Sequence, residues 1–392
     1  MEKKIHLVHI VGTLNTGGVQ RFILNLLTSP EFAHYKQSVI CVLSDQGELR
    51  QEFEKNNVDI FFCPFIYPHS LNIPSYRLTK WIRQRWVVTF PYRLASLLGR
   101  IQADLVHTNI TKNINLQAKG VLSLAKVPWV WSIHGSYKPH GVELTRWKRA
   151  LSLMKDNNAC LIFVSSSLLD DFKSRGLSPI PDYTKVIHVG VDDQFFLRVL
   201  SNSSKFRQSL QISDDCVLFG SLGRLVDEKG YDILIKAAIA LNKDKELAHF
   251  LIAGSGPLYN DLSKQISKQG GGNYIHLLGN LDDAAGFLGN LDAFVMPSRS
   301  EGFPIALLEA LAVGLPCIVT DLGGISEMVG LDSAMLIPSE SPEDLESALK
   351  KFLNSSVRQF YSYKSVQIAK KYSVKKSALE LNETYVTLLH KS

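Results

Sequence analysis

Short runs of consecutive apolar residues alternate along the chain with longer segments in which apolar residues recur every three or four positions. The short runs are typical of strands buried on both faces, and the longer segments are typical of amphipathic helices, such as Tyr231–Leu241 and Pro304–Ala312. Strands that alternate with helices predict parallel sheets covered by helices on both sides. The predicted strands are Ile5–Val11, Gln37–Leu43, Asp59–Cys63, Leu105–His107, Val130–Ile133, Leu161–Val164, Lys185–His188, Val217–Ser221, His249–Ala253, Ile275–Leu278, Ala293–Met296, Pro316–Thr320 and Ala334–Ile337.

This alternation falls into two series, which indicate two domains. A chain of 392 residues is too long for one compact core, so we expect two Rossmann-like, doubly wound α/β domains that face each other across a cleft. Their expected ranges are 1–195 and 196–372, joined near Gly190–Ser204, where a Ser/Asn stretch suits a linker. The last segment, 373–392, predicts an amphipathic helix that returns to the first domain. Its expected apolar face consists of Val374, Ala378, Leu381, Tyr385 and Leu388.

Composition excludes several classes of protein. Hydrophobic residues make up 45% of the chain and charged residues 20%, which is typical of globular proteins and excludes wholesale disorder. No run approaches the roughly 18 consecutive apolar residues that a membrane-spanning helix needs. The N-terminal sequence MEKKIHLVHIVG lacks the apolar core and the cleavage site of a signal peptide, so we expect a cytoplasmic protein.

The cysteines are odd in number and widely separated, and no C-x-x-C pair occurs. Most of them lie inside apolar runs, so we expect buried thiols rather than disulfides or a metal site. The five positions are Cys41, Cys63, Cys160, Cys216 and Cys317.

Charge is distributed unevenly between the two halves. Residues 1–190 carry 23 Lys and Arg against 13 Asp and Glu, a net charge of +10, whereas the remaining residues carry a net charge of −4. This asymmetry favours an anionic partner for the first half. The segment Ser75–Arg93 interleaves basic and aromatic residues, and no acidic residue occurs between Asp59 and Asp104. The residues concerned are Tyr76, Arg77, Lys80, Trp81, Arg83, Arg85, Trp86, Phe90, Tyr92 and Arg93.

Two interpretations of Ser75–Arg93 stay open. Basic residues over an apolar layer suit the anionic surface of a membrane, which would make the protein peripheral on the inner face. A solvated helix with aromatic residues in the core accounts for the same pattern. Single-stranded nucleic acid also suits it, but nothing else in the chain does, so no nucleic-acid partner is expected.

The segment richest in chemical signals runs from Pro297 to Glu309, with the sequence PSRSEGFPIALLE. A predicted strand ends at Met296, and Pro304 opens a helix where its missing N–H group costs nothing. The first N–H groups of such a helix can bind anionic or hydroxyl oxygens, helped by the helix dipole. Glu301 precedes the helix and Glu309 lies within it, so the two carboxylates can hold different parts of one ligand.

Here the chain resembles the retaining enzymes of glycosyltransferase family 4, which have the GT-B fold. The spacing of Glu301 and Glu309 is similar to that family's E-x7-E element. The resemblance covers nearly the whole chain, through a glycine loop at Gly17-Gly18 in LNTGGVQRFILNL, the interdomain segments Val164–Ser166 and Val186–Asp192, and the donor-domain motifs GSLGRLVDEKGYDILIKA and LIAGSGP.

The resemblance implies that the second half holds a nucleotide diphosphate sugar. Arg224 and Lys229 follow a strand end, where two cations suit the oxygens of a diphosphate as it departs. Glu301 is then expected to hold the sugar, and Glu309 the ribose or phosphate end. The loop of Gly254 and the helix entry at Gly302 would complete the donor site. Its remaining expected residues are Gly256, Pro257, Phe303, Pro304 and Ile305.

In the first half the resemblance implies roles for Gly17, Gly18 and His134. The two glycines lack Cβ atoms and let the backbone approach a phosphate or sugar, and there is no third glycine at dinucleotide spacing. A purely structural turn remains the alternative for these glycines, as a helix-starting turn does for Gly254 and Gly256. His134 is expected to face the donor sugar, whereas His107 is explained equally well as a core histidine.

The resemblance implies transfer of a hexosyl group from a UDP- or GDP-sugar to an acceptor hydroxyl of a saccharide or lipid-linked molecule. Anomeric configuration would be retained, with front-side attack. No cofactor or metal is expected, because the cations of the protein cover the diphosphate and no D-x-D pair of the metal-using type occurs. One departure from the family pattern is Val189-Gly190, where an Asn-Gly pair is common. The alternatives are a glycoside hydrolase that uses Glu301 and Glu309, and a non-catalytic protein that binds nucleotide sugars.

Overall fold

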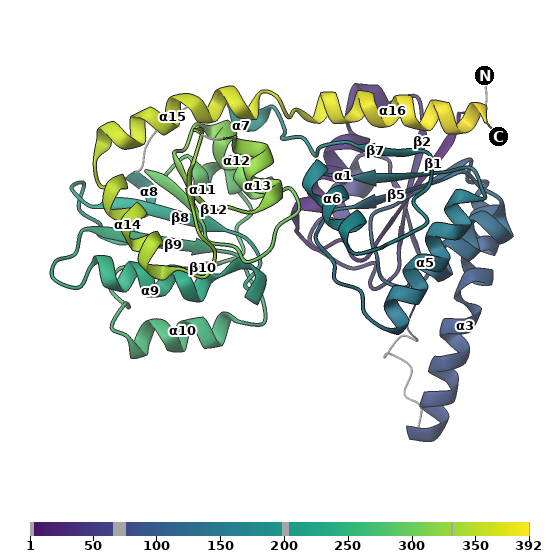
Figure 1. The fold of residues 1–392 in the computed structure, drawn as a ribbon, viewed down its shortest axis with the longest axis horizontal. Helices are drawn as coiled ribbons and strands as arrows, with labels where there is room; N and C mark the ends of the chain where they lie inside the picture. The colour runs from purple at the N-terminus through teal and green to yellow at the C-terminus, as the bar shows by residue number, and fades with distance from the viewer. Residues whose placement is uncertain (1–3, 66–75, 198–203, 331, 392) are drawn as a thin grey trace. The chain divides into compact units, whose positions relative to one another are not determined.

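The computed structural model describes residues 4–65, 76–197, 204–330 and 332–391 (Figure 1), and for 76–85 and 204–205 it describes the backbone alone. The chain divides into two compact units. Unit 1 comprises Met1–His188 with Lys375–Ser392, and unit 2 comprises Val189–Val374.

Unit 1 is built on a parallel sheet of seven strands in the order β3-β2-β1-β4-β5-β6-β7. The order reverses between β1 and β4, as in a Rossmann-like sheet, and most strand residues are buried on both faces. The predicted strands of this half are confirmed. They are β1 (His6–Val11), β2 (Lys36–Cys41), β3 (Asp59–Phe62), β4 (Leu105–Thr108), β5 (Trp129–Ile133), β6 (Ala159–Phe163) and β7 (Thr184–Val186).

Helices cover both faces of the unit 1 sheet. The helices α3, α4 and α5 pack with the π-helical turn η2 as one layer. The helical elements before residue 189 are α1 (Gly18–Leu27), η1 (Pro30–Phe32), α2 (Arg50–Lys55), α3 (Tyr76–Ile101), α4 (Ile114–Ala118), η2 (Lys119–Ala125), α5 (Val142–Lys155) and α6 (Ser166–Ser174).

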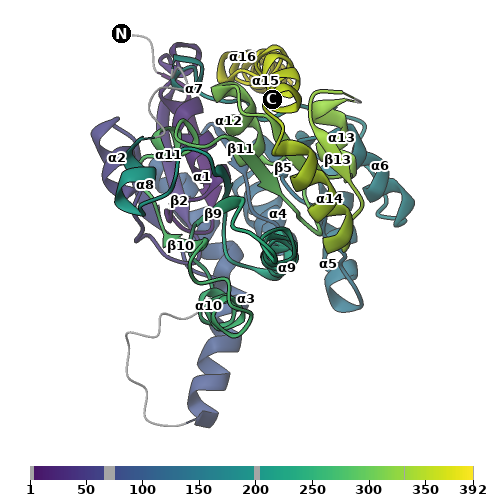
Figure 2. The same cartoon turned by 90° about the vertical axis from the view of Figure 1, so that its left-hand side faces the viewer.

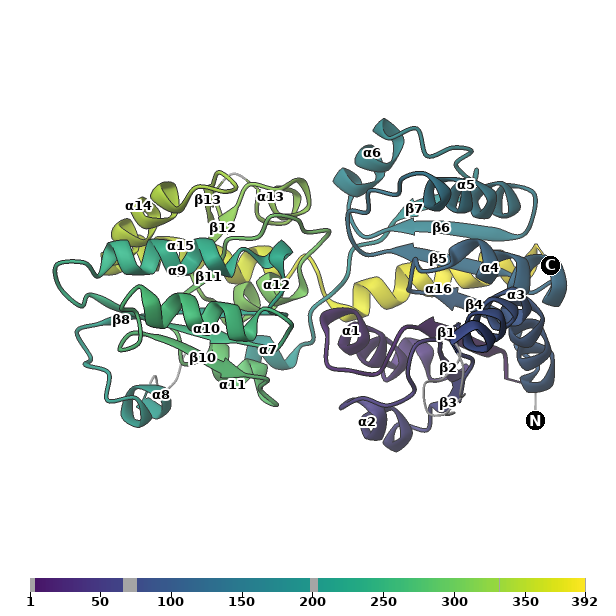
Figure 3. The same ribbon diagram turned by 90° about the horizontal axis from the view of Figure 1, so that it is seen from below.

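The C-terminal helix α16 (Val374–His390) covers the opposite face, as Figure 3 shows. Successive residues of a strand point to opposite faces. Thr108 of β4 reaches Gln117 of α4, whereas its neighbour His107 hydrogen-bonds the hydroxyl of Tyr385 of α16 at 2.5 Å. The predicted return of the C-terminal helix to the first domain is therefore confirmed. Its buried residues include Ala378, Leu381, Tyr385 and Leu388, as expected.

Unit 2 contains a parallel sheet of six strands in the order β10-β9-β8-β11-β12-β13, which is again the Rossmann order. The predicted strands of this half are confirmed as well. They are β8 (Val217–Leu222), β9 (Ala248–Ala253), β10 (Ile275–Gly279), β11 (Ala293–Met296), β12 (Cys317–Thr320) and β13 (Met335–Ile337).

In unit 2 the helices α9, α10 and α14 form one layer, visible in Figure 2, and α11, α12, α13 and α15 pack against one another. Helix α12 is buried on all sides from Leu307 to Val313, which suits a sequence that is apolar except for Glu309. The helical elements are α7 (Gln194–Leu197), α8 (Ser204–Ser209), η3 (Asp227–Lys229), α9 (Tyr231–Leu241), α10 (Tyr259–Lys268), α11 (Ala284–Leu288), α12 (Ile305–Val313), α13 (Gly323–Val329), α14 (Pro342–Phe352) and α15 (Ser355–Ala369).

The two chain segments that connect the units pair with each other. Val191 and Ser373 form an isolated parallel bridge. A Cβ atom at Gly190 would lie 2.2 Å from the carbonyl carbon of Ser373, so only glycine allows this approach. Val189, which stands where the resembling family commonly has asparagine, is 2% exposed. Its apolar side chain is therefore buried.

Within Ser75–Arg93, Ser75 and the side chains up to Arg85 lie outside the described residues. Beyond them, Phe90 is fully buried, and the Arg93 guanidinium lies 4.1 Å from the centroid of the Trp86 ring. The indole of Trp86 and the guanidinium of Arg93 both donate to the carbonyl oxygen of Pro64. Phe90 thus belongs to the interior of unit 1, and Trp86 and Arg93 are half-buried, whereas Tyr92 is exposed.

Four of the five cysteines are buried, as predicted. The expectation is wrong for Cys216, whose position just before β8 leaves it only half-buried. Among the described residues, no helix combines the length and the apolar character needed to cross a membrane.

Candidate active site

In unit 2, three loops that follow strands β8, β11 and β12 meet at the carboxyl edge of the sheet. Glycines without side chains make the contacts possible. A Cβ atom at Gly230 would lie 2.0 Å from the carbonyl oxygen of Pro297, and one at Gly324 would lie 1.6 Å from that of Gly302. The sequence SEGFP therefore lies between two neighbouring loops, at the edge where doubly wound sheets bind ligands.

Arg299 fastens the loop after β11 to the turn η3. Its guanidinium donates to both carboxylate oxygens of Asp232, at 2.8 and 2.9 Å, and also to Glu340 and to the backbone of Asp227. Burial would raise the pKa of Asp232, but the bonds from Arg299 hold it below its usual range. Arg299 was not singled out from the sequence, although this residue lies between Pro297 and Glu301 in the motif.

These bonds from Arg299 hold the turn η3 against the loop after β11 and so place Lys229 beside Glu301. The ammonium Nζ of Lys229 lies 2.7 Å from Oε1 of Glu301, and the same oxygen accepts a hydrogen bond from the hydroxyl of Ser298, also at 2.7 Å. The side chains of Lys229 and Glu301 are 20% and 9% exposed. Two of the residues predicted to be functional, 72 positions apart in the sequence, thus form a half-buried ion pair.

Arg224 lies on the same loop as Lys229 but has a different environment. Its side chain is exposed, and within the described part of the chain it has no hydrogen-bond or ion-pair partner. It can therefore bind an anion without breaking an existing bond.

Helix α12 begins beside this charge pair. Pro304 is its N-cap residue, not its first residue, and Leu308 makes the first intrahelical bond, to the carbonyl of Pro304. The N–H groups of the preceding turn, which begins at the half-buried Ile305, have no partner within the helix. Phe303 is buried against Tyr372, with ring centroids 5.1 Å apart, and Glu309 is buried within α12.

Gly254 and Gly256 follow β9 and have a clear structural role. Gly254 has φ of +136°, and a Cβ atom there would lie 1.9 Å from the carbonyl oxygen of Gly223. A Cβ atom at Gly256 would lie 2.4 Å from the carbonyl oxygen of Leu225. The two glycines let the loop after β9 pack against the loop that carries Arg224. The next residue, Pro257, is exposed.

In unit 1, Gly17 and Gly18 lie where the loop after β1 enters helix α1. Gly17 is the N-cap residue in an extended conformation, with φ of −167°, which any residue can adopt. Its conformation therefore gives no structural reason for glycine.

His134 lies at the carboxyl end of β5 and belongs to a chain of hydrogen bonds. Its Nε2 atom is 3.0 Å from Oδ1 of Asn109, and Nδ2 of Asn109 is 3.2 Å from Nδ1 of His9. Because the amide oxygen only accepts and the amide nitrogen only donates, His134 must carry its proton on Nε2. Its Nδ1 atom is then the acceptor that remains for a ligand hydroxyl.

Burial lowers the pKa of His134 to about 4 and that of His9 to about 3, so both rings are neutral near pH 7. His107 is different, since both of its ring nitrogens are bonded inside the core, to Tyr385 and to Ser132. The core interpretation of His107 is therefore the one that its contacts support.

The structure thus brings Lys229, Glu301 and the start of α12 together in unit 2, with Arg224 on the same loop as Lys229, while Gly17, Gly18 and His134 lie in unit 1. The contact that sequence reasoning missed in unit 1 is Asn109, which fixes the protonation of His134. A lone asparagine after a strand carries no signal of this role.

Comparison with known families gives matches over most of the chain. The family described as Glycosyltransferase Family 4 matches residues 16–195, and the family described as Glycosyl transferases group 1 matches residues 202–372.

Two relatives illustrate the similarity. TuaC of Bacillus subtilis is 29% identical over 259 residues, which cover 65% of this chain but less than two thirds, 62%, of TuaC. A UDP-Gal:alpha-D-GlcNAc-diphosphoundecaprenol alpha-1,3-galactosyltransferase of Escherichia coli is 27% identical over 342 residues, covering 82% of this chain and 80% of the relative.

Among solved structures, that of HepE from Anabaena in complex with UDP and glucose has a TM-score of 0.80 and 18% sequence identity. The superposition covers 98% of this chain and 100% of HepE. At this identity the likeness concerns the fold, which is the GT-B fold of two parallel-sheet α/β domains.

Proposed function

This chain belongs to the group 1 glycosyltransferases of family 4, and on that premise we propose that it transfers a hexosyl group from a UDP- or GDP-sugar to an acceptor hydroxyl, with retention of anomeric configuration. The family match gives the glycoside hydrolase alternative no support. A catalytically silent protein is the alternative that the experiment below tests.

One observation carries the proposal: Lys229 and Glu301 lie in contact just before α12, and Arg224, exposed and without a partner among the described residues, lies on the same loop as Lys229. Two cations and a helix N-terminus suit the oxygens of a diphosphate, and an adjacent carboxylate suits sugar hydroxyls. A hydrolase would need two carboxyl groups that flank one glycosidic bond. Here one carboxylate is bound to a lysine and the other is buried in a helix.

The proposed reaction is a front-side displacement. The bond between the anomeric carbon and the phosphate oxygen breaks, and its electron pair leaves with the nucleoside diphosphate. Arg224, Lys229 and the first N–H groups of α12 stabilise the charge that develops there. The acceptor oxygen bonds to the same face of the sugar, and its proton passes to the departing phosphate. His134 accepts a hydrogen bond from a sugar hydroxyl at Nδ1.

We further propose a lipid-linked or saccharide acceptor, and hence a role in glycan, polysaccharide or glycolipid biosynthesis. The Escherichia coli relative is described as acting on a diphosphoundecaprenol-linked sugar. The structure of HepE holds UDP and glucose, which favours UDP as the nucleotide.

The test is calorimetric titration of the protein with UDP, GDP and ADP, followed by their sugars with an acceptor. We expect UDP or GDP to bind and Lys229→Ala to weaken that binding by about 10- to 150-fold, since a hydrogen bond to a charged group contributes roughly 1.5–3 kcal/mol. Proton NMR of the product should show the anomeric configuration of the donor. Inversion would refute the mechanism, and binding without transfer to any acceptor would favour the silent alternative.

A further inference from the structure

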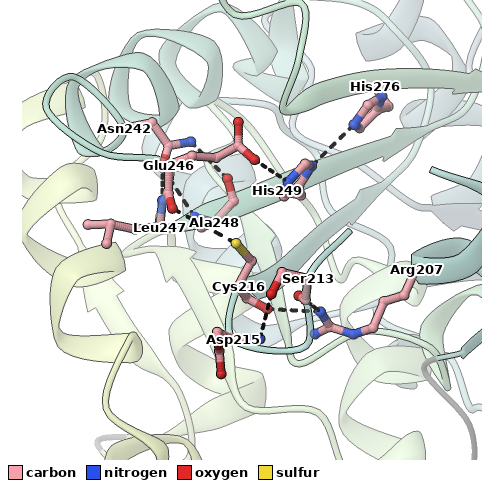
Figure 4. Close-up of polar contacts among 10 residues, drawn as sticks. All are labelled: Arg207, Ser213, Asp215, Cys216, Asn242, Glu246, Leu247, Ala248, His249 and His276. Carbon is pink, nitrogen blue, oxygen red and sulfur yellow. Dashed lines mark hydrogen bonds and ion pairs between the residues drawn. The ribbon is translucent and has the colours of Figure 1, made fainter. Parts of the chain in front are cut away.

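A second group of side chains lies at the amino edge of the unit 2 sheet, away from the loops that carry Arg224 and Glu301. Cys216 directly precedes β8, Glu246 lies two residues before β9, and His249 is the second residue of β9. The thiol sulfur, one carboxylate oxygen and one ring nitrogen all lie within 4.8 Å of one another. Figure 4 shows these side chains converging from neighbouring strands.

The three atoms are grouped nearly as closely as the ligands of a small, tetrahedral metal ion. Bonds of about 2.0–2.3 Å to Zn²⁺ put neighbouring ligand atoms about 3.3–3.8 Å apart. The Nε2 atom of His249 lies 3.0 Å from Oε1 of Glu246, so binding would separate these atoms by a few tenths of an ångström. The Glu246 side chain is 46% exposed and free to make that adjustment. A thiolate and a carboxylate would balance the charge of the ion.

The orientation of His249 matches that of a metal ligand. Ligating histidines usually donate their second ring N–H to another acceptor, which fixes the tautomer. The Nδ1 atom of His249 lies 3.4 Å from Nε2 of His276, the second residue of β10, and the two rings are parallel. His249 is 4% exposed and cannot turn away. Its Nε2 atom is directed at Glu246 and donates its proton there, because a carboxylate only accepts. When a metal ion replaces that proton, the neutral ring can carry its proton on Nδ1 and donate it to Nε2 of His276.

The backbone on both sides of the group is held in place, as Figure 4 also shows. The amide of Asn242 bonds the backbone of Leu247 and Ala248 and so fixes the loop that carries Glu246. The guanidinium of Arg207 donates to the carbonyl oxygens of Ser213 and Cys216 and fixes the segment that carries the thiol. Because these segments are already ordered, less conformational entropy is lost when the three side chains bind an ion.

We propose that Cys216, Glu246 and His249 bind Zn²⁺, with water in the fourth position and His276 orienting His249. Thiolate and imidazole are the ligand types that favour zinc over magnesium or calcium. The ion would link the amino ends of β8 and β9. Because it lies at the edge opposite the candidate active site, it stabilises unit 2 and takes no part in sugar transfer.

The test uses metal-free protein titrated with Co²⁺ and Zn²⁺. Co²⁺ should produce a thiolate charge-transfer band in the near ultraviolet that Zn²⁺ abolishes. Zn²⁺ should also raise the melting temperature by several degrees, since it binds the folded state. Cys216→Ser should remove the band, and Glu246→Gln should weaken Zn²⁺ binding at least tenfold. Both positions are at least partly exposed, so these variants should fold.

Two further variants test the orienting role of His276 and provide a control. His276→Gln should weaken Zn²⁺ binding by about 10- to 100-fold without removing the cobalt band, as loss of an orienting partner does. His140→Ala, which changes an exposed histidine of unit 1, should leave binding unchanged. Absence of the band, or a band that persists in Cys216→Ser, would overturn the proposal.

Discussion

The contact between Lys229 and Glu301 must be broken or shared when a ligand of unit 2 binds Lys229. The ammonium group of Lys229 contacts a carboxylate that is 9% exposed and also bonded to Ser298. A diphosphate that approaches Lys229 therefore competes with Glu301 for the same cation. Arg224, exposed and without a partner in the described residues, has no such competition. Arg224 is thus expected to make the first contact, and Lys229 the contact that changes partner.

We expect Glu301→Gln to reduce sugar transfer by roughly 100-fold or more, the size of effect found when one stabilising group in a catalytic site is removed. Affinity for the bare nucleotide should stay within about threefold of the parent or increase, because Lys229 loses its competing partner. Calorimetry with UDP or GDP and a transfer assay measure the two effects.

The matched control is Glu228→Gln, which removes an exposed carboxylate from the turn η3 next to Lys229. It should change neither quantity. If Glu301→Gln weakened nucleotide binding as strongly as Lys229→Ala, the carboxylate would hold the nucleotide and not the sugar.

At the scale of elements, the loops after β8 and β9 are built around glycine. Gly254 donates its N–H to Gly279 while its α-carbon packs on the backbone of Gly223. No other residue combines a φ of +136° with an approach this close. The position of the loop that carries Arg224 and Lys229 therefore depends on a residue that has no side chain.

Gly254→Ala should lower the melting temperature by about 4–10 °C. A side chain at this φ costs roughly 1–3 kcal/mol before the clash is counted, and each kcal/mol shifts the melting temperature of a unit this size by about 2–4 °C. Gly272→Ala, where a Cβ atom meets nothing within 4 Å, should change it little. Equal stability of the two variants would show that the loop relaxes around the added methyl group.

The elements themselves were largely predictable. The period of the apolar residues located every strand of both sheets, and Tyr231–Leu241 was predicted as the helix that the structure contains. Such signals are strong because parallel strands covered on both faces are apolar throughout. Helix α12 begins one residue later than predicted, because Pro304 has an extended conformation and caps the helix instead.

At the scale of the whole molecule, residues 1–190 carry a net charge of +10, and the membrane hypothesis rests on it. Part of the basic and aromatic segment that suggested a membrane surface has a structural role within unit 1, since Phe90 is buried and Arg93 packs on Trp86. Val88 and Tyr92 on the same helix remain exposed, at 66% and 55%. The membrane hypothesis therefore concerns these residues and the basic residues before Trp86.

Binding to vesicles that contain anionic lipid should weaken steeply as salt is added. Each basic residue contributes about 1 kcal/mol near such a surface, and the attraction fades within roughly 8 Å at physiological salt. Trp81→Ala combined with Arg83→Glu and Arg85→Glu should abolish sedimentation with vesicles. Lys148→Glu with Arg149→Glu, two exposed residues of α5, should leave most of it. A parent protein that ignores such vesicles at low salt and glycosylates a soluble acceptor efficiently would contradict the hypothesis.

The sequence by itself determined the two series of strands, the C-terminal helix and the position of Glu301 before α12, because periodicity and turn residues act over a few neighbouring positions. Only the tertiary structure decided which side chains meet. Lys229 reaches Glu301 because Arg299 joins two loops, and His107 reaches Tyr385 across 278 positions. Cys216 and His249 come together because β8 and β9 are neighbours in the sheet. These partners depend on strand order, which no local pattern encodes.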